Sequence, residues 1–155
     1  MGDVLKKRLR QGRPLGPSED ALLNLLVAAG SVRAALDRAC ARFGMTNRQY
    51  NVLRILRGVH PGGHPRQEIA VRMIERAPDV TRLVDRLQAR GLVERARSGS
   101  DRRQAIARIT PRGLSLLKRM DVDLDAVHRV FARRVPAGES RRLSKICEVL
   151  YGTDE

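Results

Sequence analysis

Arginine and hydroxyl side chains gather in the middle of the chain, at a spacing that suits contact with a nucleic acid. Arg82 presents a planar fork of donors, which can pair bidentately with the edge of a guanine base. Thr81 can bond a base edge or a phosphate, and Arg86, one helical turn later, is better placed for a phosphate. The alternative is a solvated polar face without a ligand. For a helix alone that alternative would be preferred, and it is the basic hairpin directly after these residues that favours duplex DNA as the ligand.

A second basic group follows in a predicted turn. Its members are Arg97, Ser98, Arg102 and Arg103. A narrow minor groove concentrates negative potential and attracts an inserted arginine. Asp101 stands two residues before Arg103 and can hold that guanidinium extended through charge-assisted hydrogen bonds. The alternative is an ordinary charged turn, but its place directly after the first group favours DNA.

The apolar pattern places the first group on a helix. Val80, Leu83, Val84 and Leu87 recur at helical spacing, and Gly91 is expected to end the helix. The outer face of this helix carries Asp79, Arg82, Asp85, Arg86 and Arg90. A helix fits the major groove, and residues near its N-terminus reach base edges. We therefore expect base contacts from Pro78, Asp79, Thr81 and Arg82.

The second group lies on a predicted hairpin. Residues 92–97 and 104–109 are strand candidates, and the second strand alternates well except at Ile106. A helix followed by such a hairpin is the recognition helix and wing of a winged helix-turn-helix.

Further helices are predicted on both sides of this unit. Apolar residues recur at helical spacing from Leu22 to Phe43, after a cap at Ser18, and the helix should end near Gly44. A capping box at residues 46–49 opens a second helix, and PRQEIAVRM forms a short third one. A long helix runs from Thr110-Pro111 to about Arg134, and a last one starts near Ala137. The predicted fold is mainly α with a small β-hairpin.

The expected organisation is a flexible basic arm at 1–17 and one domain at 18–150. Within the domain, residues 46–110 form the winged helix-turn-helix that binds DNA. The helices at 18–44 and 111–150 lie outside it, and their apolar stripes need a partner. Because the sequence offers no second core, we expect these helices to pair with a second copy of the chain.

Charge and composition limit the class of partner. The net charge of +14 indicates a polyanion, either nucleic acid or an anionic membrane. No apolar run is long enough for a membrane span, and the start of the chain is not a secretory signal. Two cysteines are too few for a disulfide framework. We expect a cytoplasmic protein without a cofactor.

Residues 64–113 resemble the MarR (multiple antibiotic resistance regulator) family of bacterial transcriptional regulators. The resemblance is carried by VTRLVDRLQARGLVER, by Asp101-x-Arg103, and by Ile109-Thr110-x-x-Gly113. Outside this unit it lies in the order of the helices.

The resemblance implies a homodimer, formed by the first and last helices, that binds pseudo-palindromic DNA and acts as a repressor. It implies that Arg103 is the wing residue that enters the minor groove and that Asp101 holds its guanidinium in place. It also implies phosphate contacts from Arg66 and Gln67 at the start of the third helix. A small aromatic anion bound between the dimerisation helices and the DNA-binding unit is the ligand that the family suggests.

The chain departs from the family between the third and fourth helices. Many members have small residues and a Ser or Thr cap there, whereas this chain has Ile74-Glu75-Arg76-Ala77. A carboxylate such as Asp79 is also an unusual residue to aim at DNA, although it can accept from cytosine N4.

Other functions have less support. The histidines are scattered and no catalytic motif is present, so an enzyme and a metal site are not expected. Cys40 is either a buried structural thiol or, as in some family members, an oxidant sensor, which needs an exposed thiol with basic neighbours. A winged helix that binds RNA or protein without operator specificity is the main alternative, since net charge supports it equally.

Overall fold

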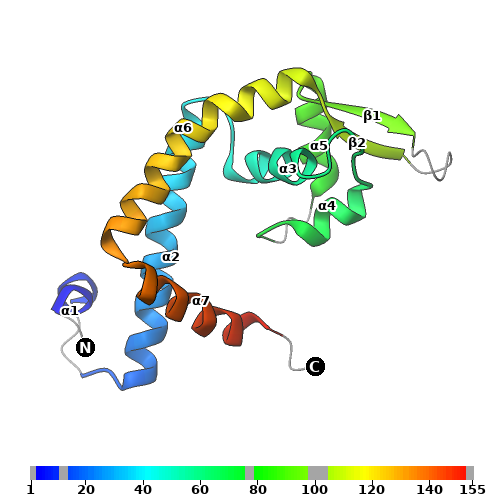
Figure 1. Ribbon diagram of the computed structural model, residues 1–155. Helices are drawn as coiled ribbons and strands as arrows, with labels where there is room; N and C mark the ends of the chain where they lie inside the picture. The colour runs from blue at the N-terminus through cyan, green and yellow to red at the C-terminus, as the bar shows by residue number, and fades with distance from the viewer. Residues whose placement is uncertain (1–2, 11–13, 76–78, 98–104, 153–155) are drawn as a thin grey trace. The chain divides into compact units, whose positions relative to one another are not determined.

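The computed structural model describes residues 3–10, 14–75, 79–97 and 105–152 (Figure 1). The chain forms two compact units, Met1–Arg38 and Ala39–Glu155. The expected boundary between an arm at 1–17 and a domain at 18–150 remains a prediction.

The first unit contains two helices. The first is α1 (Asp3–Leu9), where the sequence predicted a flexible arm and no helix. A seven-residue helix is marginal on its own, and burial of the Leu5 side chain stabilises this one. The second, α2 (Pro17–Ala41), begins one residue before the expected cap at Ser18 and continues into the second unit. Its predicted stop, Gly44, follows in a left-handed conformation with φ of 63°.

The core of the second unit surrounds α3 (Asn47–Arg57), which contacts three other helices and the hairpin (Figure 1). The predicted capping box is confirmed, because Thr46 and Gln49 bond each other's backbone N–H groups. The helices around α3 are α4 (Arg66–Arg72), α5 (Val80–Ala89) and α6 (Pro111–Arg134). Three α3 side chains, Val52, Leu53 and Leu56, have no exposed surface. Helix α3 therefore positions the elements on which the candidate site is built.

The predicted hairpin is confirmed as β1 (Val93–Arg97) and β2 (Ala105–Ile109), which pair antiparallel. Ile106 and Ala107 are both buried, so β2 is covered on both faces and does not alternate cleanly. An added backbone bridge lies beside β2, since His64 and Ala107 exchange N–H···O bonds of 3.0 and 2.8 Å. Gly63 has φ of 110°, and a Cβ there would lie 2.5 Å from the carbonyl oxygen of Ala107. The turn before α4 therefore needs a glycine to reach the wing.

The last two helices begin where the sequence predicted. Thr110 caps α6, its hydroxyl accepting a bond from the N–H of Gly113, and Pro111 opens the helix. Its buried residues, Gly113, Leu116, Leu117, Met120 and Leu124, lie in its first two thirds. Helix α7 (Ala137–Tyr151) has no buried residue. None of the helices in the described ranges has both the length and the hydropathy that a membrane span requires.

Candidate nucleic-acid interface

Helix α5 divides into a buried face and an exposed polar face, as predicted. Val80, Val84 and Leu87 are buried against the core. Thr81, Arg82 and Arg86 are exposed on the outer face. Since the helix is both anchored and uncovered, its polar side chains are accessible to a groove of DNA.

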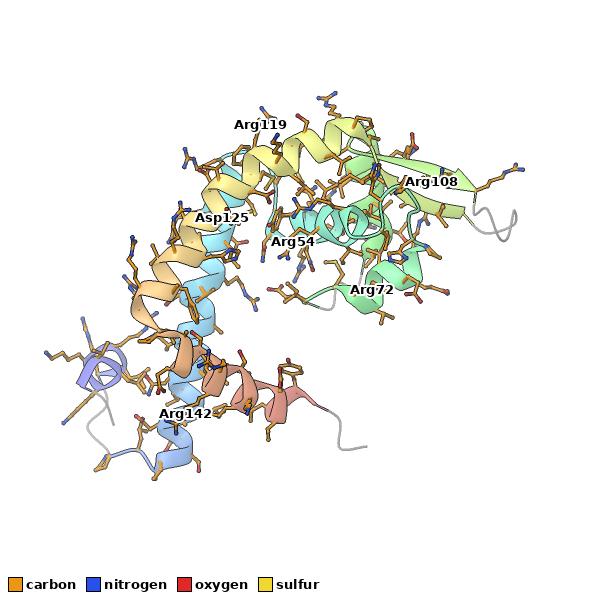
Figure 2. The ribbon with its side chains drawn as sticks, in the orientation of Figure 1. Arg54, Arg72, Arg108, Arg119, Asp125 and Arg142 are labelled. Atoms are coloured by element: carbon orange, nitrogen blue, oxygen red, sulfur yellow. The ribbon has the colours of Figure 1, made fainter. Side chains whose placement is uncertain are left out.

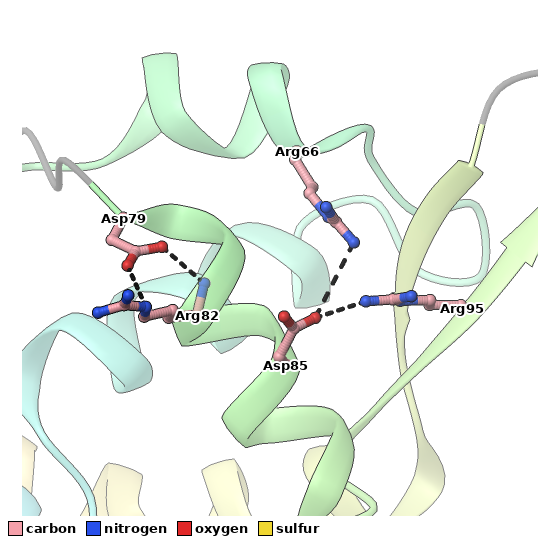
Figure 3. Close-up of polar contacts among 5 residues, drawn as sticks. All are labelled: Arg66, Asp79, Arg82, Asp85 and Arg95. Carbon is pink, nitrogen blue, oxygen red and sulfur yellow. Dashed lines mark hydrogen bonds and ion pairs between the residues drawn. The ribbon is translucent and has the colours of Figure 1, made fainter.

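Asp79 caps the N-terminus of α5 and holds Arg82. Its Oδ1 accepts a hydrogen bond from the backbone N–H of Arg82 at 3.0 Å. Its Oδ2 lies 2.8 Å from Nε of the same residue (Figure 3). Asp79 thus caps α5 in this chain, where many members of the family have a Ser or Thr cap. Both of its oxygens are engaged by Arg82, and its predicted contact with a base remains untested.

Asp85 connects three elements through one carboxylate oxygen. Oδ1 accepts from Nη2 of Arg95 on β1 at 2.5 Å and lies 3.9 Å from Nη2 of Arg66 on α4 (Figure 3). All three side chains are about half exposed, so these pairs add little to stability. Their effect is to orient Arg66 and Arg95 toward the outer face of α5. The sequence placed Asp85 on that face, but the pairing with a helix and a strand follows from tertiary packing.

The connection between α4 and α5 is held by α3. The buried Asn51 accepts a hydrogen bond from the backbone N–H of Ile74 through Oδ1 at 2.9 Å. Arg48 of α3 lies 3.5 Å from the carboxylate of Glu75. Sequence reasoning missed Asn51, whose only signal was an amide beside the apolar residues Val52 and Leu53. Contacts from α3 therefore hold Ile74 and Glu75, the start of the segment in which this chain departs from the family.

The C-terminus of α5 is fixed by hydrogen bonds from two side chains. The guanidinium of Arg90 donates to the carbonyl oxygens of Gly44 at 2.7 Å and Phe43 at 3.3 Å. The hydroxyl of Thr110 donates to the carbonyl oxygen of Gly91 at 2.8 Å. The sequence placed Arg90 on the polar outer face, whereas it is half-buried and bonds the turn after α2. The C-terminal end of α5 is thus tied to the turn after α2 and to the start of α6, while its N-terminal end is capped by Asp79.

The other predicted site residues are placed as follows. Gln67 is exposed in the first turn of α4, and Arg97 is exposed at the end of β1. Pro78, Ser98, Asp101, Arg102 and Arg103 lie outside the described residues.

Arginine side chains extend from several elements of the second unit, including Arg54, Arg72, Arg108 and Arg119 (Figure 2). Some of them contact other groups of the same unit. Arg108 donates to the carbonyl oxygen of Gly62 at 2.5 Å, and Arg72 lies 3.4 Å from Glu68. Others are on exposed surface, and with a net charge of +14 they make the protein attractive to a polyanion.

The remaining candidates for chemistry have geometries that favour structural roles. Cys40 has no exposed surface, which disfavours the oxidant-sensor hypothesis, since that requires an accessible thiol. Its neighbour Arg42 lies 3.1 Å from Asp123 of α6. Across the described ranges, no three His, Cys, Asp or Glu side chains are grouped so that they could hold a metal ion.

Comparisons with known proteins agree with this geometry. The sequence profile of the MarR family matches residues 43–104. The HTH-type transcriptional regulator MhqR of Bacillus subtilis (strain 168) is 30% identical over 87 residues, 56% of this chain and 59% of MhqR. The match with that curated relative thus spans less than two thirds of its length.

Solved structures match over more of the chain. CouR from Rhodococcus jostii RHA1, in complex with p-coumaroyl-CoA, has 25% identity and a TM-score of 0.79, covering 92% of this chain and 99% of CouR. A MarR transcription factor from Planctomyces limnophilus has 35% identity and a TM-score of 0.67, covering 88% of this chain and 99% of that protein. The winged helix and these matches together show that the chain belongs to the MarR family of transcriptional regulators.

Proposed function

We propose that this protein is a homodimeric regulator that binds a specific DNA operator and represses transcription. The observation that carries the proposal is that α5 exposes a polar face and is anchored to the rest of the second unit. Its polar face presents Thr81, Arg82 and Arg86 to solvent, while Asp79 caps its N-terminus and its C-terminus is bonded to neighbouring elements. A helix held in this way can enter a major groove as a rigid body.

The contacts we assign follow the chemistry of each side chain. Thr81 and Arg82 read base edges, together with Pro78. Arg86, Arg66 and Gln67 bind phosphates, which sets affinity and not sequence preference. On the wing, Arg103 enters the minor groove of the DNA, and Asp101 holds its guanidinium in place. Arg97, Ser98 and Arg102 contact the sugar-phosphate backbone of the DNA.

The homodimer is supported by the apolar side chains that the chain leaves uncovered. On α7, Ile146, Val149, Leu150 and Tyr151 are between 58% and 83% exposed, and on α2, Leu22 and Leu26 are also exposed. Such clusters are uncommon on a monomeric protein and mark an interface. A dimer would present two α5 helices to successive major grooves, roughly 34 Å apart.

A small aromatic anion is the class of ligand that we propose as the inducer. The support is the likeness to CouR, whose structure contains p-coumaroyl-CoA. Release of bound DNA on addition of p-coumaroyl-CoA or p-coumarate, but not of acetate, tests this class. If no aromatic acid or thioester releases the DNA, the proposed inducer class is wrong while the DNA-binding function stands.

A competition experiment tests the main function. Purified protein is titrated with a labelled fragment from upstream of its own gene, against unlabelled random DNA, at several salt concentrations. We expect a preference of about a thousandfold or more for one fragment. A ratio near one would favour a winged helix that binds RNA or protein without operator specificity.

A further inference from the structure

The carboxylate of Asp79 contacts Arg82 in two ways (Figure 3). Oδ1 accepts from the backbone N–H of Arg82 at 3.0 Å, which caps α5. Oδ2 lies 2.8 Å from Nε, an ion pair that holds the guanidinium near the N-terminus of α5. A cap needs only the first contact, so the second calls for a separate explanation.

Arg82 remains accessible although it is held. Its side chain is 78% exposed, compared with 43% for Asp79. An exposed arginine normally samples many rotamers and loses that freedom when it binds a ligand. Fixing Nε against a carboxylate removes part of this loss before DNA arrives. The pairing therefore prepares Arg82 for a ligand without covering it.

The donors left on Arg82 determine which ligand it suits. The ion pair with Asp79 engages Nε, so the two terminal nitrogens of Arg82 are left as further donors. Two parallel N–H donors match the O6 and N7 acceptors of guanine in the major groove. The nearby carboxylate repels a phosphate, which disfavours simple backbone contact. Both effects favour a guanine edge over a phosphate.

We propose that Asp79 is a positioning residue that makes Arg82 a reader of guanine. This inference rests on the proposed DNA-binding function and deepens it, because it gives Asp79 a role in base preference without direct contact with a base. The competing explanation is that Asp79 serves the cap alone.

Selection of bound sequences from a randomised operator half-site tests the proposal. Asp79→Asn keeps an oxygen for the cap but replaces the other carboxylate oxygen with an NH2 group, which removes the negative charge that pairs with the guanidinium of Arg82. Asp79→Ser also keeps a cap and removes the second contact. In both variants we expect the preference for guanine at one position to fall roughly tenfold, with a melting temperature close to that of the wild type.

Asp85→Asn is the matched control. It removes one negative charge from the same face of α5, but the carboxylate that it removes pairs with Arg66 and Arg95. Non-specific affinity should rise similarly in Asp79→Asn and Asp85→Asn. Only the Asp79 variants should lose the guanine preference.

A second experiment asks whether Asp79 acts through Arg82. In an Arg82→Ala background, Asp79→Asn should change base preference no further. A further change there would overturn the proposal, as would an unaltered guanine preference in Asp79→Asn alone. If the wild type shows no base preference at any position, the proposed function fails as well, so the two failures are distinguishable.

Discussion

The hydroxyl of Thr110 donates a hydrogen bond to the carbonyl oxygen of Gly91 at 2.8 Å, and so joins the end of α5 to the start of α6. The same hydroxyl oxygen accepts from the N–H of Gly113 at 3.1 Å. One side chain therefore caps α6 and satisfies a carbonyl group at the C-terminus of the recognition helix. A change in the position of α6 would reach α5 through this contact.

Replacing Thr110 by Val should weaken this junction. Valine keeps the shape of threonine but removes the donor and the acceptor together, at a cost of about 1–2 kcal/mol in the free energy of unfolding. Chemical denaturation measures the loss. Thr110→Ser keeps the hydroxyl and should be much closer to the wild type. Equal stability of the Val and Ser variants would show that the two hydrogen bonds are not important.

Gly113 allows α6 to approach the wing closely. A Cβ at this position would clash with the carbonyl oxygen of Leu92, a backbone atom that cannot move aside, and would lie 2.7 Å from Cγ1 of Ile109. Gly113→Ala should therefore lower the free energy of unfolding by about 1–3 kcal/mol. Gly138→Ala is the control, because nothing lies within 4 Å of its Cβ position and alanine is favoured over glycine in a helix, so the variant should be at least as stable as the wild type. A stable Gly113→Ala protein would contradict the close approach.

Arg86 should bind DNA without reading its sequence. The side chain is exposed on α5, one turn after Arg82, so its removal should leave folding stability close to that of the wild type. We expect Arg86→Ala to weaken binding to operator and random DNA by a similar factor and to reduce the slope of log K against log salt by about one. A salt titration of both DNAs measures this. Loss of affinity confined to the operator would instead assign Arg86 to a base edge.

Tyr50 gives the second unit a pH dependence at the alkaline end. Burial raises the pKa of its hydroxyl above the ordinary value of 10.0, and Asp121 adds to the increase while Arg54 and Arg57 oppose it. Between the unfolded and folded pKa values the unfolded chain has lost a proton that the folded protein keeps, so stability falls as pH rises above about 10. Tyr50→Phe should lose less stability than the wild type between pH 9 and 11. Parallel curves would contradict the assignment.

The regular elements could be predicted because their signals are local. The capping box at Thr46, the periodic apolar residues of α5 and the Thr110-Pro111 start each depend on a few neighbouring residues, and the structure confirms all three. The wing strands were placed to within one residue of the structure for the same reason. Helix α1 was missed, because seven residues give too short a pattern to detect.

The contacts that fix the site could not be predicted, because they join residues distant in sequence. Arg90 lies on the polar side of the α5 pattern, yet it bonds Gly44, and no periodicity relates the two. Asn51 looks like a polar residue out of place in α3 until the backbone of Ile74 is seen beside it. Residue types alone identified the exposed arginines but not the pairing of Asp79 with Arg82 or of Asp85 with Arg66 and Arg95.

The apolar side of α7 provides the test of the proposed dimer. Ile146 and Leu150 are four residues apart on one face of the helix and are 58% and 65% exposed. Ile146→Asp places a charge where we propose that two chains meet, and its desolvation should shift the protein to monomers at micromolar concentration. Analytical ultracentrifugation measures the mass.

Lys145→Asp is the control, since it changes the charge of the adjacent, exposed residue, which lies about 100° around the helix. It should remain dimeric. Because a monomer presents one α5 helix instead of two, Ile146→Asp should also lose operator affinity by over tenfold while it keeps the helical content of the wild type. A wild-type protein that sediments as a monomer, or an Ile146→Asp variant that stays dimeric, would show that α7 does not hold the two chains together.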